Sequence, residues 1–215
     1  EFPGFIELAQ ISAFVPVEAQ TAWTFEAGTR GNAGIASWDL TFYRSNVDNE
    51  LLQYTVGPDI PASTFNADQT RHQGIEAALE LRLTDWLDLR QVYQFNDFRF
   101  RGDAQIGNNP LPVIPKHLYR AELKLGQKNW HVSPGIEGVP TGAWADYANT
   151  FKAEGYATLN LSGALQVTKT TELFADTGNL TNKRAAGDIS PLVNYGTLLP
   201  FQRAIFYPVE RRSLF

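Results

Sequence analysis

Residues 71–83 read RHQGIEAALELRL, and apolar and polar side chains alternate along this stretch. The apolar side chains share one parity: Ile75, Ala77, Leu79, Leu81 and Leu83. Polar side chains occupy the other parity: His72, Glu76, Glu80 and Arg82. Successive side chains of a β-strand point to opposite faces, so this spacing predicts a long strand with one apolar and one polar face. A helix would instead scatter the leucines around its circumference.

The same alternation recurs along most of the chain. A second alternating stretch begins at Leu87, directly after the short segment Thr84-Asp85-Trp86, and the two stretches together predict a hairpin. Further stretches of this kind lie at residues 23–28, 36–43, 119–125 and 157–166, and a less regular one at 172–179. We therefore predict an all-β chain of about nine to ten strands with no helix.

The connections between these strands alternate in length. Short turns are expected at residues 31–34, 84–86, 126–129 and 167–171. Long connections rich in Gly, Pro and Asn are expected at residues 56–68, 101–115, 138–153 and 182–202. Alternation of short and long places all the long loops at one end of an antiparallel sheet. Outer-membrane barrels have this arrangement, so the sequence favours an antiparallel transmembrane β-barrel.

Two other classes of protein share parts of this pattern. A soluble β-sandwich binding module also has alternating strands, although its strands are usually about five or six residues long. A passive porin, or a small self-contained outer-membrane barrel, would share the loop pattern as well. Tryptophans near the expected strand ends fit the aromatic belts of membrane barrels or ordinary core anchors: Trp23, Trp38, Trp86 and Trp130.

Composition excludes several functions. The chain has no cysteine, which rules out a disulfide framework, thiol catalysis and cysteine metal sites. A net charge of −5 argues against a nucleic-acid partner. We find no catalytic motif, and the three histidines, His72, His117 and His131, are not expected to converge. We therefore expect no enzyme activity, no metal site and no cofactor in this chain.

Charged side chains on the polar parity are expected to line the inside of the barrel. They are Glu26, Arg30, Asp39, Glu76, Glu80, Arg82, Arg90, Arg120, Glu122 and Lys124. One interpretation is that they contact an inner domain or a charged solute. The other is a lattice of cross-strand ion pairs along a solvated wall, and this is the favoured interpretation for any single residue.

Aromatic residues in the long, polar connections are the candidate ligand-binding groups. They are Trp144, Tyr147, Phe151, Tyr195 and Phe201. Aromatic side chains on exposed loops bind ligands by stacking or through cation–π contacts. Packing of the loops against one another over the barrel mouth would use the same residues.

Several short motifs, in order along the chain, carry a resemblance to a known family. The segment WTFEAG at 23–28 and the pattern of Asn66 followed by GIE at 74–76 are two of them. PKH at 115–117, NLTNK at 179–183, and Pro208 with RRS at 211–213 are the others. Together they resemble the C-terminal half of the barrel of TonB-dependent outer-membrane receptors, so residues 1–215 are expected to be a C-terminal portion of such a barrel.

The resemblance implies a larger molecule. Members of this family are 22-stranded barrels in the bacterial outer membrane that hold an N-terminal plug domain, which is not expected in this sequence. They take up scarce solutes, such as ferric siderophores, other metal chelates or cofactors, with force transmitted by TonB. The implied partners are therefore the remainder of the barrel, the plug, the TonB complex, outer-membrane lipid and the solute.

The number of strands adds one expectation about closure. About nine strands form less than half of a 22-stranded barrel, and a small barrel has an interior that side chains nearly fill. Small wall residues such as Gly74, Ala78 and Ala164 would fill such an interior poorly. We therefore expect an open arc in which the strand near residues 23–30 does not pair with residues 211–215.

Overall fold

The computed structural model describes residues 17–56, 62–197 and 205–214. The strands of the main sheet are β1 Thr21–Ala33, β2 Ala36–Tyr54, β3 Ser63–Thr84, β4 Leu87–Phe100, β5 His117–Gln127, β6 Trp130–Val139, β7 Tyr156–Gln166, β8 Glu172–Gly178 and β11 Ser213–Leu214. A separate hairpin contains β9 Ala186–Ser190 and β10 Ile205–Pro208. The only helical segment of the described residues is a 3-10 turn, η1 Tyr195–Thr197. No helix in these ranges is long and apolar enough to cross a membrane.

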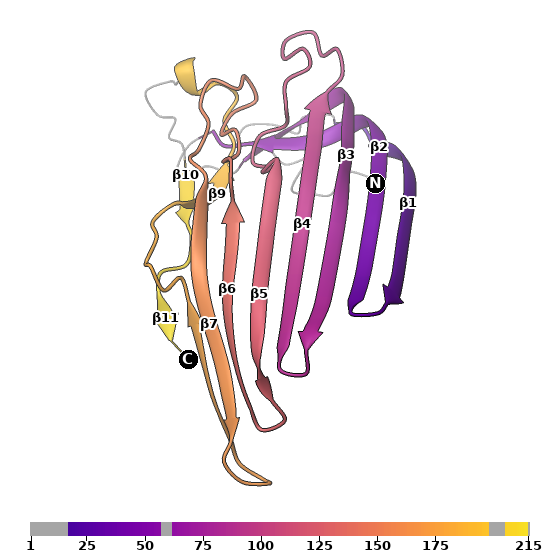
Figure 1. Cartoon of the computed structure of the whole chain (residues 1–215). Helices are drawn as coiled ribbons and strands as arrows, with labels where there is room; N and C mark the ends of the chain where they lie inside the picture. Colours follow the sequence, from indigo (N-terminus) through magenta and orange to yellow (C-terminus); the bar gives the residue numbers. More distant parts are fainter. Residues whose placement is uncertain (1–16, 57–61, 198–204, 215) are drawn as a thin grey trace.

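The nine strands form one curved antiparallel sheet in the order β1-β2-β3-β4-β5-β6-β7-β8-β11 (Figure 1). Within the described residues, β1 pairs only with β2, and β11 pairs only with β8. The sheet is therefore an open arc, as predicted. The described residues contain neither a second sheet packed face to face with the arc nor a closed small barrel, so the soluble sandwich and the small self-contained barrel are wrong, whereas the passive porin stays an alternative.

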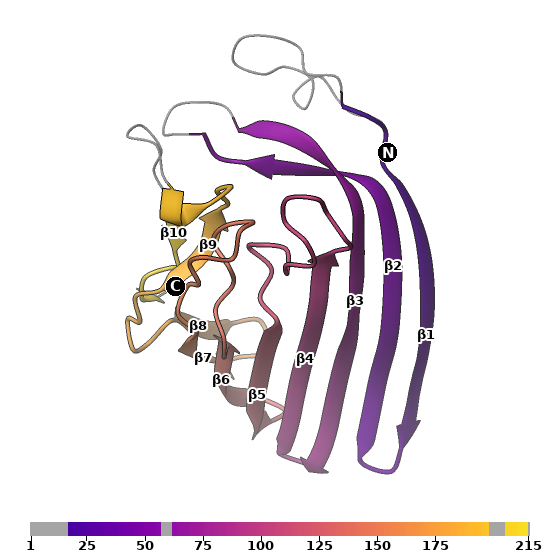
Figure 2. The ribbon, with the colours of Figure 1, turned by 90° about the horizontal axis from the view of Figure 1, so that it is seen from above.

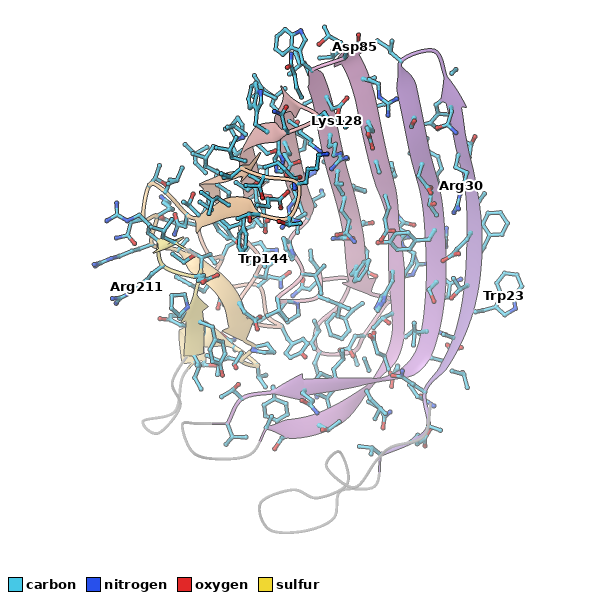
Figure 3. The ribbon with its side chains drawn as sticks, turned by 90° about the horizontal axis from the view of Figure 1, so that it is seen from below. Trp23, Arg30, Asp85, Lys128, Trp144 and Arg211 are labelled. Carbon is cyan, nitrogen blue, oxygen red and sulfur yellow. The ribbon has the colours of Figure 1, made fainter. Side chains whose placement is uncertain are left out.

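The strand register separates the two faces of the arc. On one face, Phe42 pairs with Ile75, and Ile75 pairs with Phe95. On the other face, Glu80 pairs with Arg90, and Arg90 pairs with Glu122. Trp23 has the parity of the apolar face in β1 and points away from the arc in Figure 3. The apolar face is thus the convex one, and the charged face lines the concave side.

The short turns lie at one end of the arc and the described parts of the long connections at the other, as the alternation of lengths predicts (Figures 1 and 2). Residues 57–61 and 198–202 of these connections lie outside the described residues. Three boundaries differ from the sequence interpretation. β1 continues to Ala33 and turns at Gly34, whose φ of 57° glycine adopts without steric cost. The first long connection is shorter than expected because β3 already begins at Ser63. The last one contains β9 and η1, which have no regular alternation of polarity.

The outer ends of β2 and β3 bend across the mouth of the arc (Figure 2). Within β2, Asn49 lies between the paired residues Asp48 and Glu50 and has a φ of 55°, a left-handed conformation that asparagine tolerates better than most residues. Beyond it, the Glu50 carboxylate accepts hydrogen bonds from Thr70 and His72. A small hydrophobic core lies at this end, built on Ala67, Phe100, Leu111 and Tyr147.

Candidate functional site

The concave face of the arc carries a lattice of cross-strand ion pairs. Arg90 lies between two carboxylates, with Nε 3.6 Å from Glu80 Oε2 and Nη1 3.9 Å from Glu122 Oε1. Arg30 Nε lies 3.3 Å from Asp39 Oδ2. These side chains are substantially exposed, so water screens each pair, and a single exposed pair contributes about 0–1 kcal/mol. These ion pairs therefore place opposite charges side by side along a wall that faces water.

The remaining charged residues predicted for the inside lie on the same face. Arg120 Nε donates to Glu137 Oε2 at 2.9 Å, and Glu76 accepts a hydrogen bond from Gln94. Arg82 Nε lies 3.9 Å from Asp88 Oδ1. The others are placed there by strand register: Lys124 opposite Asp88, and Glu26 opposite Tyr43. The structure therefore gathers all of them on one wall, and their contact with a plug or a solute stays a prediction.

A hollow on this concave wall lies between the sheet and the segment that leads to β11. It has a volume of about 500 Å³, and residues that line it include Arg120, Glu137, Asn160, Asn179 and Glu210. Asn179 closes one side, since its Nδ2 donates to the backbone carbonyls of Lys183 and Glu210. Its lining is largely polar, so the hollow can accommodate hydrophilic groups.

The aromatic residues of the long connections divide by environment. Tyr147 is buried at 3% exposure, and its ring contacts the rings of Phe65 and Phe100 at centroid distances of 5.2 and 5.9 Å. Its hydroxyl donates to the backbone carbonyl of Gln53 at 2.7 Å. Burial raises the pKa of the Tyr147 phenol, with a smaller contribution from the charge of Glu50. In this structure Tyr147 ties the bent strands to the loop that follows β6.

Phe151 and Tyr195 come together from two loops that are distant in the sequence. Their rings stack at a centroid distance of 4.6 Å and an interplanar angle of 22°. The ring of Phe206 contacts Phe151 edge-on at 5.9 Å. Trp144 lies under a cation instead, with Lys152 Nζ 5.4 Å from its ring centroid. Trp144, Phe151 and Tyr195 are partly exposed, whereas Phe201 lies outside the described residues.

Asp146 organises these loops, and the sequence interpretation did not identify it. Its carboxylate is fully buried and accepts hydrogen bonds from the backbone N–H groups of Thr150, Phe151 and Tyr195 and from the Thr150 hydroxyl. Aspartate in a loop commonly bonds nearby backbone N–H groups, so its local role has a sequence signal. The contact with Tyr195 has none, because it joins residues 49 positions apart.

The described residues contain no group of three or more His, Asp or Glu side chains that could hold a metal ion. The three histidines make separate contacts in different parts of the structure. His72 stacks on Phe98 at 4.3 Å, and His117 Nδ1 lies 2.8 Å from the Tyr93 hydroxyl. His131 lies beside the short turn between β5 and β6, at the opposite end from the loops.

In a comparison with protein families, residues 2–180 match a model described as TonB dependent receptor-like, beta-barrel. The chain belongs to this family. Membership agrees with the open, antiparallel arc and with the resemblance of the motifs. A search of curated proteins gives no match.

Solved structures show that the fold is that of TonB-dependent receptor barrels. The ferric yersiniabactin uptake receptor FyuA from Yersinia pestis matches 94% of this chain at 15% identity, with a TM-score of 0.74. The copper transporter OprC matches 99% at 18% identity and a TM-score of 0.77. The ferric citrate transporter FecA matches 90% at 20% identity and a TM-score of 0.70. The chain spans only 30%, 34% and 30% of these three receptors, about a third of each.

Proposed function

We propose that this chain forms the C-terminal part of the barrel of a TonB-dependent transporter in a bacterial outer membrane. The observation that carries the proposal is that, among the described residues, the outer edge of β1 has no paired strand, in a sheet whose convex face is largely apolar. In hydrocarbon, unpaired backbone N–H and C=O groups cost several kcal/mol each, so β1 requires another strand beside it. The remainder of a large barrel supplies that strand.

The concave wall fits contact with a plug domain. Its charges are paired across strands and accessible from the lumen, as a hydrated surface against another domain requires. The polar hollow beside Arg120 and Asn179 offers donors and acceptors for the surface of such a domain. We assign the predicted inner charges to this wall, where most of them hold the plug and do not touch the solute.

The loop aromatics fit the first capture of a solute. Trp144, Phe151 and Tyr195 are partly exposed at the end of the arc that carries the long connections, and Phe151 and Tyr195 already form a stacked pair there. Tyr147 anchors the loop that carries Trp144 and Phe151 to the outer end of β2, through its hydrogen bond to Gln53. The solute class is a ferric siderophore, another metal chelate or a cofactor such as cobalamin, and the step is TonB-driven transport without covalent chemistry.

Binding and uptake by the complete receptor test this proposal. Purified receptor is titrated with ferric citrate, a ferric catecholate chelate, a copper(II) chelate and cobalamin, and intrinsic fluorescence is followed. We expect one class to bind, and uptake of it by cells to require TonB. The Tyr195→Ala variant should weaken binding about tenfold or more, whereas Trp86→Ala, at the short-turn end, should not change it. Uptake that continues without TonB would support a passive porin instead.

A further inference from the structure

The convex face changes character at the outer ends of β2, β3 and β4. Below this level most of the paired residues are apolar, as in the row formed by Phe42, Ile75 and Phe95. The next row on the same parity contains Arg44, Gln73 and Asp97, and the row above it contains Asn46, Arg71 and Arg99. A set of charged side chains therefore faces outward, away from the lumen.

The height of this set matches the boundary of a membrane. From Leu87 to Asp97, β4 advances about 34 Å along its axis at ~3.4 Å per residue. A tilt of about 35–45° reduces this to about 24–28 Å, close to the apolar band of about 25 Å on outer-membrane barrels. Trp23 and Phe25 lie at the same level on β1, opposite Asn46 and Arg44, as residues of an aromatic belt would.

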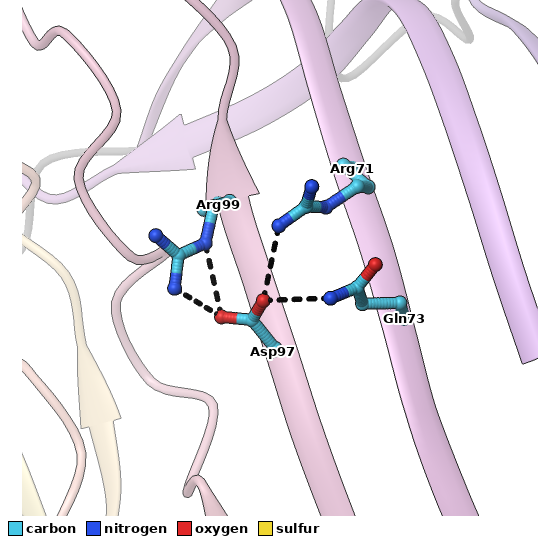
Figure 4. A network of polar contacts seen from close by, with 4 residues as sticks. All are labelled: Arg71, Gln73, Asp97 and Arg99. Atoms are coloured by element: carbon cyan, nitrogen blue, oxygen red, sulfur yellow. Dashed lines mark hydrogen bonds and ion pairs between the residues drawn. The ribbon is translucent and has the colours of Figure 1, made fainter.

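The charges at this boundary form an ordered network (Figure 4). Asp97 accepts a hydrogen bond from Arg71 Nη2 at 3.1 Å, from Gln73 Nε2 at 3.0 Å and from Arg99 Nε at 2.9 Å. Both arginines are partly buried, with side-chain exposures of 15% for Arg71 and 33% for Arg99. Asp97 thus fixes the two guanidinium groups in place, and a single carboxylate offsets only one of their two positive charges.

Further cations extend the network toward the loops. Lys116 Nζ lies 5.7 Å from the ring centroid of Phe95, a residue of the apolar row. Arg99, Lys116 and Lys152, together with Asp97 and Trp144, line a cavity of about 70 Å³. We call Arg44, Arg71, Arg99, Lys116 and Lys152 the outer basic cluster.

We propose that the outer basic cluster binds phosphate groups of anionic lipids in the outward-facing leaflet. Guanidinium and ammonium groups are the donors that bind phosphate, and here they lie directly above an apolar surface that accommodates acyl chains. A lipid bound in this way contacts both surfaces at once, which a soluble anion does not. The inference rests on the proposed insertion into the outer membrane and is independent of which solute is transported.

The test uses the complete receptor purified in an uncharged detergent. Dioleoylphosphatidic acid is the probe, and retained lipid is counted by native mass spectrometry across a titration. Near a membrane each basic residue contributes about 1 kcal/mol, which is roughly fivefold in affinity. We therefore expect Lys116→Gln/Lys152→Gln and Arg71→Gln/Arg99→Gln each to weaken retention by about 25-fold. The lysine pair is exposed, so it remains informative if the arginine pair impairs folding.

Three controls define the alternatives. Lys128→Gln removes a positive charge from the turn at the opposite end of the arc (Figure 3) and should leave retention unchanged. Dioleoylphosphatidylcholine should be retained far less, and inorganic phosphate at the same concentration should not displace the lipid. The proposal would be overturned if the Lys116→Gln/Lys152→Gln variant retained as much lipid as the wild type. Displacement of the lipid by inorganic phosphate would overturn it as well. Because no solute or TonB is present, either result leaves the transport proposal standing, whereas a receptor that fails to insert into membranes would contradict both.

Discussion

The Asp146 carboxylate accepts a hydrogen bond from the backbone N–H of Tyr195 at 2.8 Å and thereby joins two loops at the mouth of the arc. The same carboxylate also bonds Thr150 and Phe151. The Phe151 ring then stacks on Tyr195. One buried group therefore positions two of the aromatic residues that we propose for solute capture.

Replacement of Asp146 by alanine should release these loops. Each buried donor left without an acceptor costs about 1–3 kcal/mol, and Asp146 serves several. We expect rapid proteolysis within residues 140–155 and rapid hydrogen exchange at Tyr195, while the strands stay protected. The matched control is Asp85→Ala, in the exposed turn between β3 and β4. Equal loop protection in both variants would contradict the role of Asp146.

Gly74 should tolerate no side chain. A Cβ at this position would lie 2.2 Å from the carbonyl oxygen of Phe95 and 2.5 Å from the Tyr43 hydroxyl oxygen. Overpacking of this kind costs about 1–3 kcal/mol, so Gly74→Ala should lower the free energy of unfolding measured by urea titration of the folded receptor. Gly135→Ala is the matched control, because its Cβ would meet only the Ala121 carbonyl oxygen at 3.4 Å. Equal stability of the two variants would refute the packing argument.

The alternation of polarity was sufficient to predict most strands of the main sheet, the two faces of its regular strands and the sorting of loops by length. This works because successive side chains of a strand point to opposite faces, so the position of a residue in the strand determines its face, as for Ile75 and Glu76. The contacts at the mouth could not be predicted in this way. Asp146 with Tyr195, and Tyr147 with Gln53, depend on how irregular loops fold back over the sheet. Residues 186–190 pair with 205–208 without an alternating pattern, so that hairpin was missed.

Alkaline pH should weaken the attachment of the bent strands. Burial raises the pKa of Tyr147 above its ordinary value of 10.0, so the folded state retains the phenol proton that an unfolded chain releases. Local stability is therefore fully present below about pH 10 and falls as the pH rises above that value. Hydrogen exchange of residues 50–54 at pH 9 and pH 11 measures this change. Tyr147→Phe should remove the dependence, and an unchanged dependence in that variant would assign it to another group.

A charged side chain in the apolar band of the convex face should destabilise the protein in a membrane. Leu79→Arg places a cation on the apolar face near the middle of the band, at a cost of about 2–4 kcal/mol. Ala78→Arg places the same group on the concave face, opposite Asp39. We expect the first variant to assemble poorly in membranes and the second to assemble normally, as shown by the amount of folded receptor in the membrane fraction. Comparable assembly of the two would contradict the assignment of faces.

The central claim is that these strands form part of a membrane-spanning barrel wall, and labelling of single cysteines in the complete receptor tests it most directly. The 215 residues contain no native cysteine, so each introduced thiol is unique within them. Spin labels at positions 75 to 83 of β3 are compared for collision with oxygen, which concentrates in lipid, and with a water-soluble nickel chelate. We predict that positions 75, 77, 79, 81 and 83 favour oxygen, whereas 76, 78, 80 and 82 favour the chelate. Equal access of the chelate at both parities, or protection of the odd positions from both reagents, would contradict the claim.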